Sequence, residues 1–372
     1  MAVGRIHINP EILESAVLRT GKTIDDCIKV DAVLAAWLKG EKAPTFKQLE
    51  SFSKKYHIPF GYLFLEKLPV EETPIPVFRK GKDAKKFNLN VYDTVLLMQK
   101  RQDWLSEYLE QNEFDVLPYV GAYKNKKVNE VVTGIYDLLK LKKGWAENTT
   151  NHQNALNILT ERIEDIGIIV SFNSIVGNNS HRKIEVEECR GFALVNDYAP
   201  FIFVNSGDSK AAQVFTIIHE MAHILVGFSA GYGIEHTWRV ENEDEQLCDR
   251  IAAEFLVPAD LLQEDWKVKS TFVDIAKKYK VSRLVAARRA LDCKLITKDD
   301  FLQFYHSYKA NIHLKTGNSP GGDFYRTALK RISKTFAIHI NNAVKSNRLL
   351  YRDAYMLTGL QGSTFSNLYT HI

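Results

Sequence analysis

The sequence of 372 residues has few of the features that mark secreted or membrane proteins. It contains only four cysteines, Cys27, Cys189, Cys248 and Cys293, and no two of them form a Cys-x-x-Cys pair. Such scattered cysteines are typical of reduced thiols and argue against a disulfide framework. No stretch approaches the roughly 18 apolar residues of a membrane helix, and residues 1–10 lack the apolar core of a secretory signal. We therefore expect a cytoplasmic protein without a membrane partner.

An excess of charge of one sign is also missing. The formal net charge is +4 and the pI is near 8.6, so the balance of charge permits nucleic-acid binding but does not indicate it. Hydrophobic residues make up 45% of the chain. With this length and composition the chain can form two or three domains, each with its own core.

The most informative segment is residues 215–225, FTIIHEMAHIL, which is a His-Glu-x-x-His box inside an apolar run. The apolar pattern predicts a buried helix, on which His219 and His223 lie one turn apart and can direct imidazole nitrogens at one point. This arrangement suits a zinc ion, and Glu220 is placed to take a proton from a metal-bound water. The alternative is an ordinary core helix, but it would leave buried polar groups unsatisfied at about 1–3 kcal/mol each. We therefore predict a zinc site with Glu220 as the catalytic base.

A catalytic zinc usually takes a third protein ligand. A third histidine six residues after the second is excluded because position 229 is serine. Residues 241–258, ENEDEQLCDRIAAEFLVP, predict a later helix with an acidic start and a proline stop. Glu245 and Asp249 share one stripe of that helix with two alanines that allow close packing, so these two acids are the candidates to face the histidines. The other acids of the helix are expected to be solvated: Glu241, Glu243, Asp244 and Glu254.

Together these segments resemble the ImmA/IrrE family of metallo-endopeptidases. The resemblance rests on the HEMAH box, on the apolar runs RGFALV (190–195) and PFIFVN (200–205), and on EQLCDRIAAEFLVP (245–258). It implies a zinc-dependent, gluzincin-like endopeptidase in which Glu245 is the third zinc ligand. Asp249 stands where the family usually has asparagine, and this departure leaves open whether Asp249 orients a ligand or competes for the metal. We predict that Glu245 binds the metal and that Asp249 orients a ligand.

The two apolar runs are predicted to be strands over 191–196 and 201–205. One of them could offer a sheet edge to an extended substrate, or both could be simply part of the core. The group that stabilises the oxyanion is not identified by the sequence. Its candidates are Tyr198, Tyr232, His236 and Arg239.

Residues 5–70 carry a second resemblance. Helices are predicted over 10–20, 23–30, 31–39 and 45–56, with Thr45 and Gln48 forming a capping box at the start of the last one. The segment 37–49, WLKGEKAPTFKQL, resembles the end of a Cro/C1-type, or XRE-like, helix-turn-helix domain. Residues 57–65, HIPFGYLFL, and 74–79, PIPVFR, resemble segments found where that domain is fused to an ImmA/IrrE peptidase. A recognition helix needs polar and basic side chains at its start, whereas residues 31–37, DAVLAAW, are nearly all apolar. Two hypotheses therefore stay open: a DNA-binding module, and a degenerate module that docks on the peptidase or binds another protein.

The expected fold is α+β and mostly helical. It comprises a helix-turn-helix bundle at 5–70, a linker at 71–89, a zincin-like peptidase domain with a small sheet at 90–310, and a helical C-terminal region at 323–372. The further predicted elements are a strand over 166–172 and helices over 90–111, 125–141, 151–167, 259–266, 272–279, 282–291, 324–345 and 349–360. The apolar face of the first of these helices is expected to hold Val91, Val95, Leu96, Met98, Trp104, Leu105 and Leu109.

The resemblance implies a protein substrate, namely a helix-turn-helix repressor or an antitoxin. Its cleavage would relieve repression in a stress, phage or mobile-element response. The competing hypothesis is a DNA-binding transcriptional regulator or antitoxin-like protein whose zinc site is structural or sensory.

Overall fold

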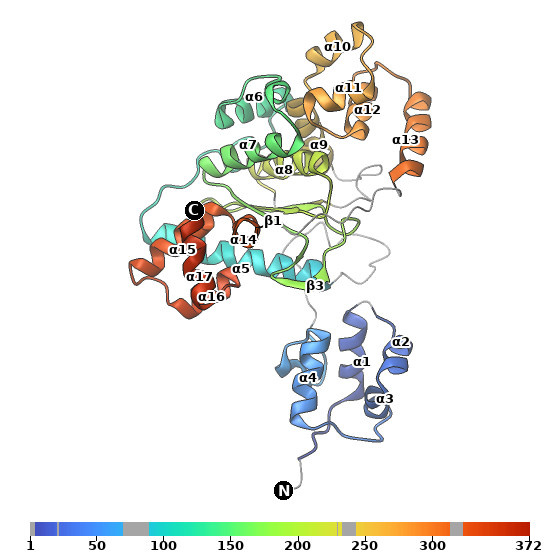
Figure 1. Cartoon of the computed structure of the whole chain (residues 1–372), viewed down its shortest axis with the longest axis vertical. Coiled ribbons are helices and arrows are strands. Elements are labelled where there is room, and N and C mark those ends of the chain that lie inside the picture. Colours follow the sequence, from blue (N-terminus) through green and yellow to red (C-terminus); the bar gives the residue numbers. More distant parts are fainter. Residues whose placement is uncertain (1–3, 21, 70–88, 229, 233–242, 313–322) are drawn as a thin grey trace. The chain divides into compact units, whose positions relative to one another are not determined.

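The computed structural model describes residues 4–20, 22–69, 89–228, 230–232, 243–312 and 323–372 (Figure 1). The chain divides into two compact units, Met1–Val95 and Leu96–Ile372. Helices dominate and one small mixed sheet lies in the second unit, so the predicted α+β, mostly helical class is confirmed. In the part of the chain that is described, no helix combines the length and hydropathy needed to span a bilayer. The predicted linker lies almost wholly outside the described residues.

The first unit is a helical bundle of α1 (Pro10–Arg19), α2 (Ile24–Val30), α3 (Ala32–Leu38) and α4 (Phe46–Tyr56), followed by the 3-10 turn η1 (Phe60–Phe64). The four predicted helices are confirmed within two residues, and so is the capping box of Thr45 and Gln48. Only Asp31 separates α2 from α3, and its side chain caps α3. The residues that fill the core are Ile12, Leu13, Ala16, Val17, Cys27, Leu34, Trp37, Leu49, Phe52, Tyr56, Ile58 and Leu63.

The sheet of the second unit has the strand order β1 (Ile169–Asn173), β5 (Phe201–Asn205), β4 (Gly191–Leu194) and β6 (Ala230–Tyr232). β1 and β5 are parallel, and the other neighbours are antiparallel. Both predicted strands are therefore interior, which corrects the idea that one of them offers an edge. The reason is that β6, whose three residues gave no strand signal, pairs with β4. A separate hairpin consists of β2 (Ile175–Val176) and β3 (Asn179–Lys183).

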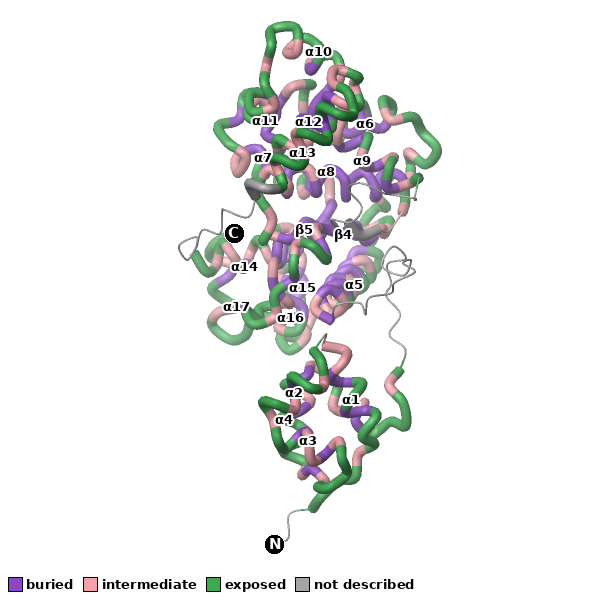
Figure 2. Tube along the Cα trace, turned by 90° about the vertical axis from the view of Figure 1, so that its right-hand side faces the viewer, coloured by how far each residue is buried: buried purple, intermediate pink, exposed green. Residues whose placement is uncertain are grey.

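Helices cover both faces of this sheet (Figure 1). One face packs against α8 (Lys210–Val226), with α6 (Val128–Leu139), α7 (His152–Asp165) and α9 (Glu243–Leu256) around it. The opposite face is aromatic: the Phe192 and Phe203 rings stack at 4.8 Å, and Phe201 meets Phe336 at 5.7 Å. Figure 2 shows that burial is concentrated along α8, α5 and the strands. Helix α8 thus lies between the sheet and other helices, inside the largest core of the second unit.

Helix α5 (Leu89–Gln111) forms as predicted, with one error on its apolar face. Leu96 is 41% exposed, whereas its neighbour Val95 is buried. Successive side chains on a helix diverge by about 100°, so the elements that pack around the helix decide which of them are covered. The polar Arg101 and Gln102 are buried instead. The Gln102 amide donates to the carbonyls of Leu194 and Ala199, both at 2.8 Å, and so holds the β4–β5 hairpin.

The C-terminal region belongs to the second unit, where α14 packs against β1, and it is broken where one helix was expected. Residues 324–345 form α14 (Phe324–Ile332) and α15 (Lys334–Lys345), which are separated by Ser333 at φ 78°. Tertiary contacts favour the break, because the Ser333 hydroxyl donates to Glu164 on α7 and accepts from the Phe336 amide. The predicted last helix is α16 (Tyr351–Thr358), and two helices without a prediction are α13 (Lys298–Ile312) and α17 (Gly362–Leu368). Short 3-10 turns are η3 (Trp145–Asn148) and η5 (Tyr369–His371).

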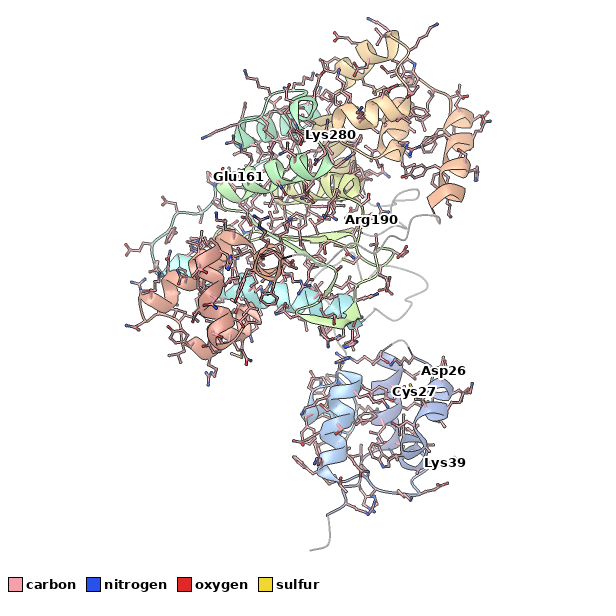
Figure 3. All side chains as sticks on the ribbon, viewed as in Figure 1. Asp26, Cys27, Lys39, Glu161, Arg190 and Lys280 are labelled. Atoms are coloured by element: carbon pink, nitrogen blue, oxygen red, sulfur yellow. The ribbon has the colours of Figure 1, made fainter. Side chains whose placement is uncertain are left out.

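The helices after α9 agree with the prediction: α10 (Ala259–Lys267), α11 (Phe272–Tyr279) and α12 (Arg283–Asp292). Lys280 lies in the turn before α12 (Figure 3), and its ammonium donates to the Lys277 carbonyl at 2.8 Å. Arg289 is buried, donates to the Val257 carbonyl and pairs with Glu254. The expectation that Glu254 is solvated is therefore wrong, since its side chain is only 18% exposed. Glu254 is kept from solvent by its pairing with Arg289, because a buried guanidinium requires a carboxylate or carbonyl partner.

Candidate metal centre

The helix that carries the His-Glu-x-x-His box has clear local determinants. The Ser209 side chain accepts a hydrogen bond from the Ala212 amide at the start of α8, and Gly227, at φ 91°, ends the helix in the left-handed conformation that favours glycine. His219, Glu220 and His223 are at most 1% exposed. The apolar run thus places three polar side chains inside the core, as its periodicity predicted.

The third member of the site comes from α9, which packs along α8. Glu245 lies in the first turn of α9 and is 1% exposed. Ala252, two turns further on, is fully buried, and such a small side chain allows two helices to approach closely. An acidic first turn also suits the positive end of the helix dipole.

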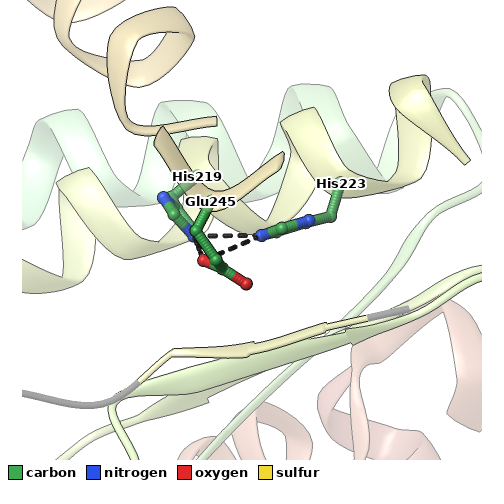
Figure 4. A group of neighbouring side chains, drawn as sticks. All are labelled: His219, His223 and Glu245. Carbon is green, nitrogen blue, oxygen red and sulfur yellow. Dashed lines mark hydrogen bonds and ion pairs between the residues drawn. The ribbon is translucent and has the colours of Figure 1, made fainter. Parts of the chain in front are cut away.

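The three side chains point at one another (Figure 4). The His219 Nε2 atom lies 3.1 Å from Glu245 Oε2 and 3.1 Å from His223 Nε2, and the His223 Nε2 atom lies 3.4 Å from Glu245 Oε2. A tetrahedral zinc ion with bonds of about 2.0–2.1 Å holds its ligands roughly 3.3–3.4 Å apart. The observed separations are close to the edges of such a tetrahedron. Within the described residues this is the only group of three or more metal-type side chains that converges in this way.

Buried polar atoms without partners provide an independent test of whether a metal fits. Glu245 Oε1, His223 Nδ1 and both carboxylate oxygens of Glu220 lack a hydrogen-bond partner among the described residues. An unsatisfied buried polar atom costs about 1–3 kcal/mol, and more if it is charged. Two imidazoles and a carboxylate are a donor set that suits zinc, and three protein donors leave a coordination position open. The residues present therefore fit a catalytic metal ion.

Asp249 lies one helical turn beyond Glu245 and reaches the far side of His219. Its Oδ1 atom is 3.0 Å from His219 Nδ1, and its side chain is 31% exposed. This is the nitrogen that does not face Glu245 and His223. A carboxylate in that position sets the orientation and tautomer of a metal-binding imidazole.

Burial and the neighbouring charges shift the pKa values of the group in opposite directions. Burial lowers the pKa of His219, but the contacts with Asp249 and Glu245 outweigh it and raise the pKa to about 10. Burial also lowers the pKa of His223. The pKa of Glu220 is raised well above its usual value, first by burial. For Glu245, hydrogen bonds from both histidines outweigh the effect of burial and hold its pKa well below the usual range. Without a metal, the two neighbouring carboxylates favour the protonated form of His219.

Of the oxyanion candidates, the side chain of Tyr198 alone belongs to the described residues, and it lies away from this site. Tyr198 lies in the β4–β5 turn, at the opposite end of β4 from Gly191, whose neighbourhood includes Glu220. The backbone of Tyr232 belongs to β6, but its side chain is outside the described set, as are His236, Arg239 and the predicted acid Glu241. A residue that the sequence reasoning missed is Gly191 itself. The only indication of its role in the sequence was a glycine at the start of the strand predicted over 191–196.

Comparison with known protein families agrees with this geometry. Residues 163–291, about a third of the chain, match the IrrE N-terminal-like domain of the Peptidase_M78 family. The matched range contains the sheet, α8 and α9, and it points to a metal-dependent peptidase with a protein substrate. Residues 332–371 match a domain of unknown function, DUF8813. A search of curated proteins finds no match.

Proposed function

We propose that this protein is a zinc-dependent endopeptidase that cleaves a helix-turn-helix repressor or an antitoxin. In this proposal His219, His223 and Glu245 hold the zinc ion, Glu220 is the general base and Asp249 orients His219. The convergence of three buried donor atoms at tetrahedral spacing, with Glu220 next to one of them in the chain, is the observation that carries it.

The chain's own residues account for the proton transfers. A zinc ion bound at such a site activates water and polarises the scissile carbonyl. Glu220 accepts the proton of the attacking water and delivers it to the leaving amine. Its raised pKa in the metal-free protein reflects burial, and a nearby dication opposes that effect by favouring the ionised form. The Asp249 carboxylate, 3.0 Å from His219 Nδ1, favours a proton on that nitrogen and so leaves Nε2 free to bind the metal.

Features of the first unit support a protein partner over direct reading of DNA. Val30 and Val33, at the end of α2 and the start of α3, are 86% and 46% exposed. The Asp31 side chain caps α3, and its carboxylate lies 2.8 Å from the Lys55 ammonium. A helix start that is already occupied by a carboxylate does not attract a phosphate group. We therefore propose that this XRE-like module contacts a protein, for which the substrate is the first candidate.

A regulator with a structural or sensory zinc site is the second candidate. The near-complete burial of the three donors is typical of a structural site as well, but structural zinc sites usually take four protein ligands. The fully buried Glu220 carboxylate follows His219 directly on α8, and a carboxylate in this position favours catalysis.

Replacing Glu220 by Gln distinguishes the two candidates. The variant and the wild type are loaded with zinc and assayed on a library of quenched fluorescent peptides, and bound zinc is measured by elemental analysis. We expect Glu220→Gln to keep one zinc per chain and to lose at least about a hundredfold in kcat/KM, the lower range for loss of general base catalysis. His223→Ala is the control that loses both zinc and cleavage. Peptide cleavage that is unchanged in Glu220→Gln would contradict the proposal.

A further inference from the structure

Gly191, the first residue of β4, lies against the helix that carries Glu220. A side-chain Cβ at this position would lie 2.5 Å from Thr216 Cγ2, 2.8 Å from the Phe203 carbonyl oxygen and 3.1 Å from Glu220 Oε1. None of these three nearest atoms belongs to His219, His223 or Glu245. A side chain at position 191 would therefore meet the proposed general base before any proposed zinc ligand.

The strand register explains why this position faces α8. Side chains alternate between the faces of a sheet, so positions 191 and 193 point to one side and position 192 to the other. Ala193 is fully buried in the core cluster that contains α8, whereas the Phe192 ring stacks on Phe203 on the aromatic face. Gly191 is thus the one position of β4 at which the sheet presents bare backbone to α8.

The packing of Glu220 gives this bare backbone a role. The Glu220 carboxylate is fully buried and neither of its oxygens has a hydrogen-bond partner among the described residues. No polar contact within that part of the chain fixes it in the metal-free protein, so its position depends on the surfaces around it. Thr216 lies one helical turn before Glu220, and it borders the same space.

We propose that Gly191 is a positioning residue for Glu220. Its missing side chain leaves the space that the carboxylate occupies between α8 and β4, and a Cβ there would displace Oε1 from that position by a few tenths of an ångström. The general base would then be misplaced while the zinc ligands keep their geometry. This inference rests on the proposed peptidase function only where it concerns the rate of cleavage; the contact between positions 191 and 220 is independent of it.

Kinetics of Gly191→Ala test the catalytic part. We expect kcat to fall by about 10- to 100-fold, because small misplacements of reacting groups reduce rates by such factors. KM and zinc affinity, measured by competition with a chelator, stay within about threefold of wild type. The matched control is Ala193→Gly, which alters the same face of the same strand but adds no atom near Glu220, and it should keep its kcat. The proposal is overturned if zinc-loaded Gly191→Ala retains its kcat, or if Ala193→Gly loses as much.

Unfolding experiments test the contact without any activity. Wild type, Gly191→Ala, Glu220→Ala and the double variant are unfolded by urea in the presence of a chelator. We expect Gly191→Ala to shift the midpoint less in the Glu220→Ala background than in the wild type, because the added Cβ then has one steric neighbour fewer. If Gly191→Ala folds only in that background, the contact is also supported.

Two outcomes of the unfolding experiment would overturn the proposal. The shifts caused by Gly191→Ala in the two backgrounds could be equal, or Gly191→Ala could prevent folding in both. In either case a side chain at position 191 is excluded by Thr216 or by the Phe203 carbonyl, and not by Glu220. A wild type without peptidase activity would refute the proposed function and leave this result standing.

Discussion

Replacing Asp249 by Asn tests how the proposed zinc site is oriented. Asp249 Oδ1 lies 3.0 Å from His219 Nδ1, and the side chain is 31% exposed. Partners of this kind typically contribute 10- to 100-fold to metal affinity. Because water screens a partly exposed carboxylate, we expect the lower end, a loss of about tenfold or roughly 1.4 kcal/mol. Zinc should still bind, since none of the three donors is removed.

The assay is zinc competition with a fluorescent chelator, repeated over a range of pH. Zinc must displace the proton that His219 holds, and the raised pKa of about 10 means that zinc affinity rises with pH through the neutral range. Asp249→Asn removes a main cause of that raised pKa, so this pH dependence should become shallower. The control is Glu243→Gln, which removes one negative charge from an exposed position of the same helix. It should alter neither the zinc affinity nor its dependence on pH. An unchanged affinity, or a loss far beyond a hundredfold that marks Asp249 as a direct ligand, would refute the reasoning.

Other predictions concern the C-terminal region. Arg101 donates to the carbonyls of Leu357 and Arg331 near the ends of α16 and α14. Arg101→Met removes both bonds, but the Arg331 carbonyl still accepts from the Ser171 hydroxyl at 2.7 Å, so mainly the buried Leu357 carbonyl loses its partner and the change should cost about 1–3 kcal/mol in urea unfolding. Ser333→Ala loses the bond to Glu164 and keeps the strained φ of 78°, so it should be less stable than Ser333→Gly by about 1 kcal/mol; equal stabilities would show that strain is absent. Burial raises the pKa of Glu164 above 4.5 despite the two hydroxyls that bind it, so the folded state holds this proton more tightly than the unfolded chain. Stability should therefore fall as pH rises from about 4.5 through the folded pKa, and Glu164→Gln should flatten this slope in urea midpoints measured from about pH 4 to 7.

Much of the helical structure could be predicted from local patterns. The bounds of α11 match the prediction, and those of α4 differ by one residue, because capping residues and periodicity act over a single turn. The relation of His219 to His223 follows in the same way, since a spacing of four residues places both on one side of any α-helix.

The error at Ser333 shows where local patterns fail. Residues 324–345 have the composition of one helix, yet the chain breaks at Ser333, where hydrogen bonds to Glu164 and the Phe336 amide hold a backbone conformation that is costly for serine. Glu164 lies far from this segment in the sequence, so no local pattern could reveal the contact. The exposed Leu96 and the buried pair of Glu254 and Arg289 have the same origin, because each depends on a neighbouring element.

For the candidate metal site, the sequence by itself determined the two histidines and the glutamate between them, because one helix positions all three. It narrowed the third donor to Glu245 or Asp249 but could not distinguish them by geometry. Only the packing of α9 on α8 decided that Glu245 reaches both Nε2 atoms while Asp249 reaches Nδ1 of His219. The place of β6 beside β4, and of Gly191 against Glu220, was likewise decided by tertiary structure. The physical reason is that helix periodicity acts between residues a few positions apart, whereas contacts between elements depend on how the whole core fills space.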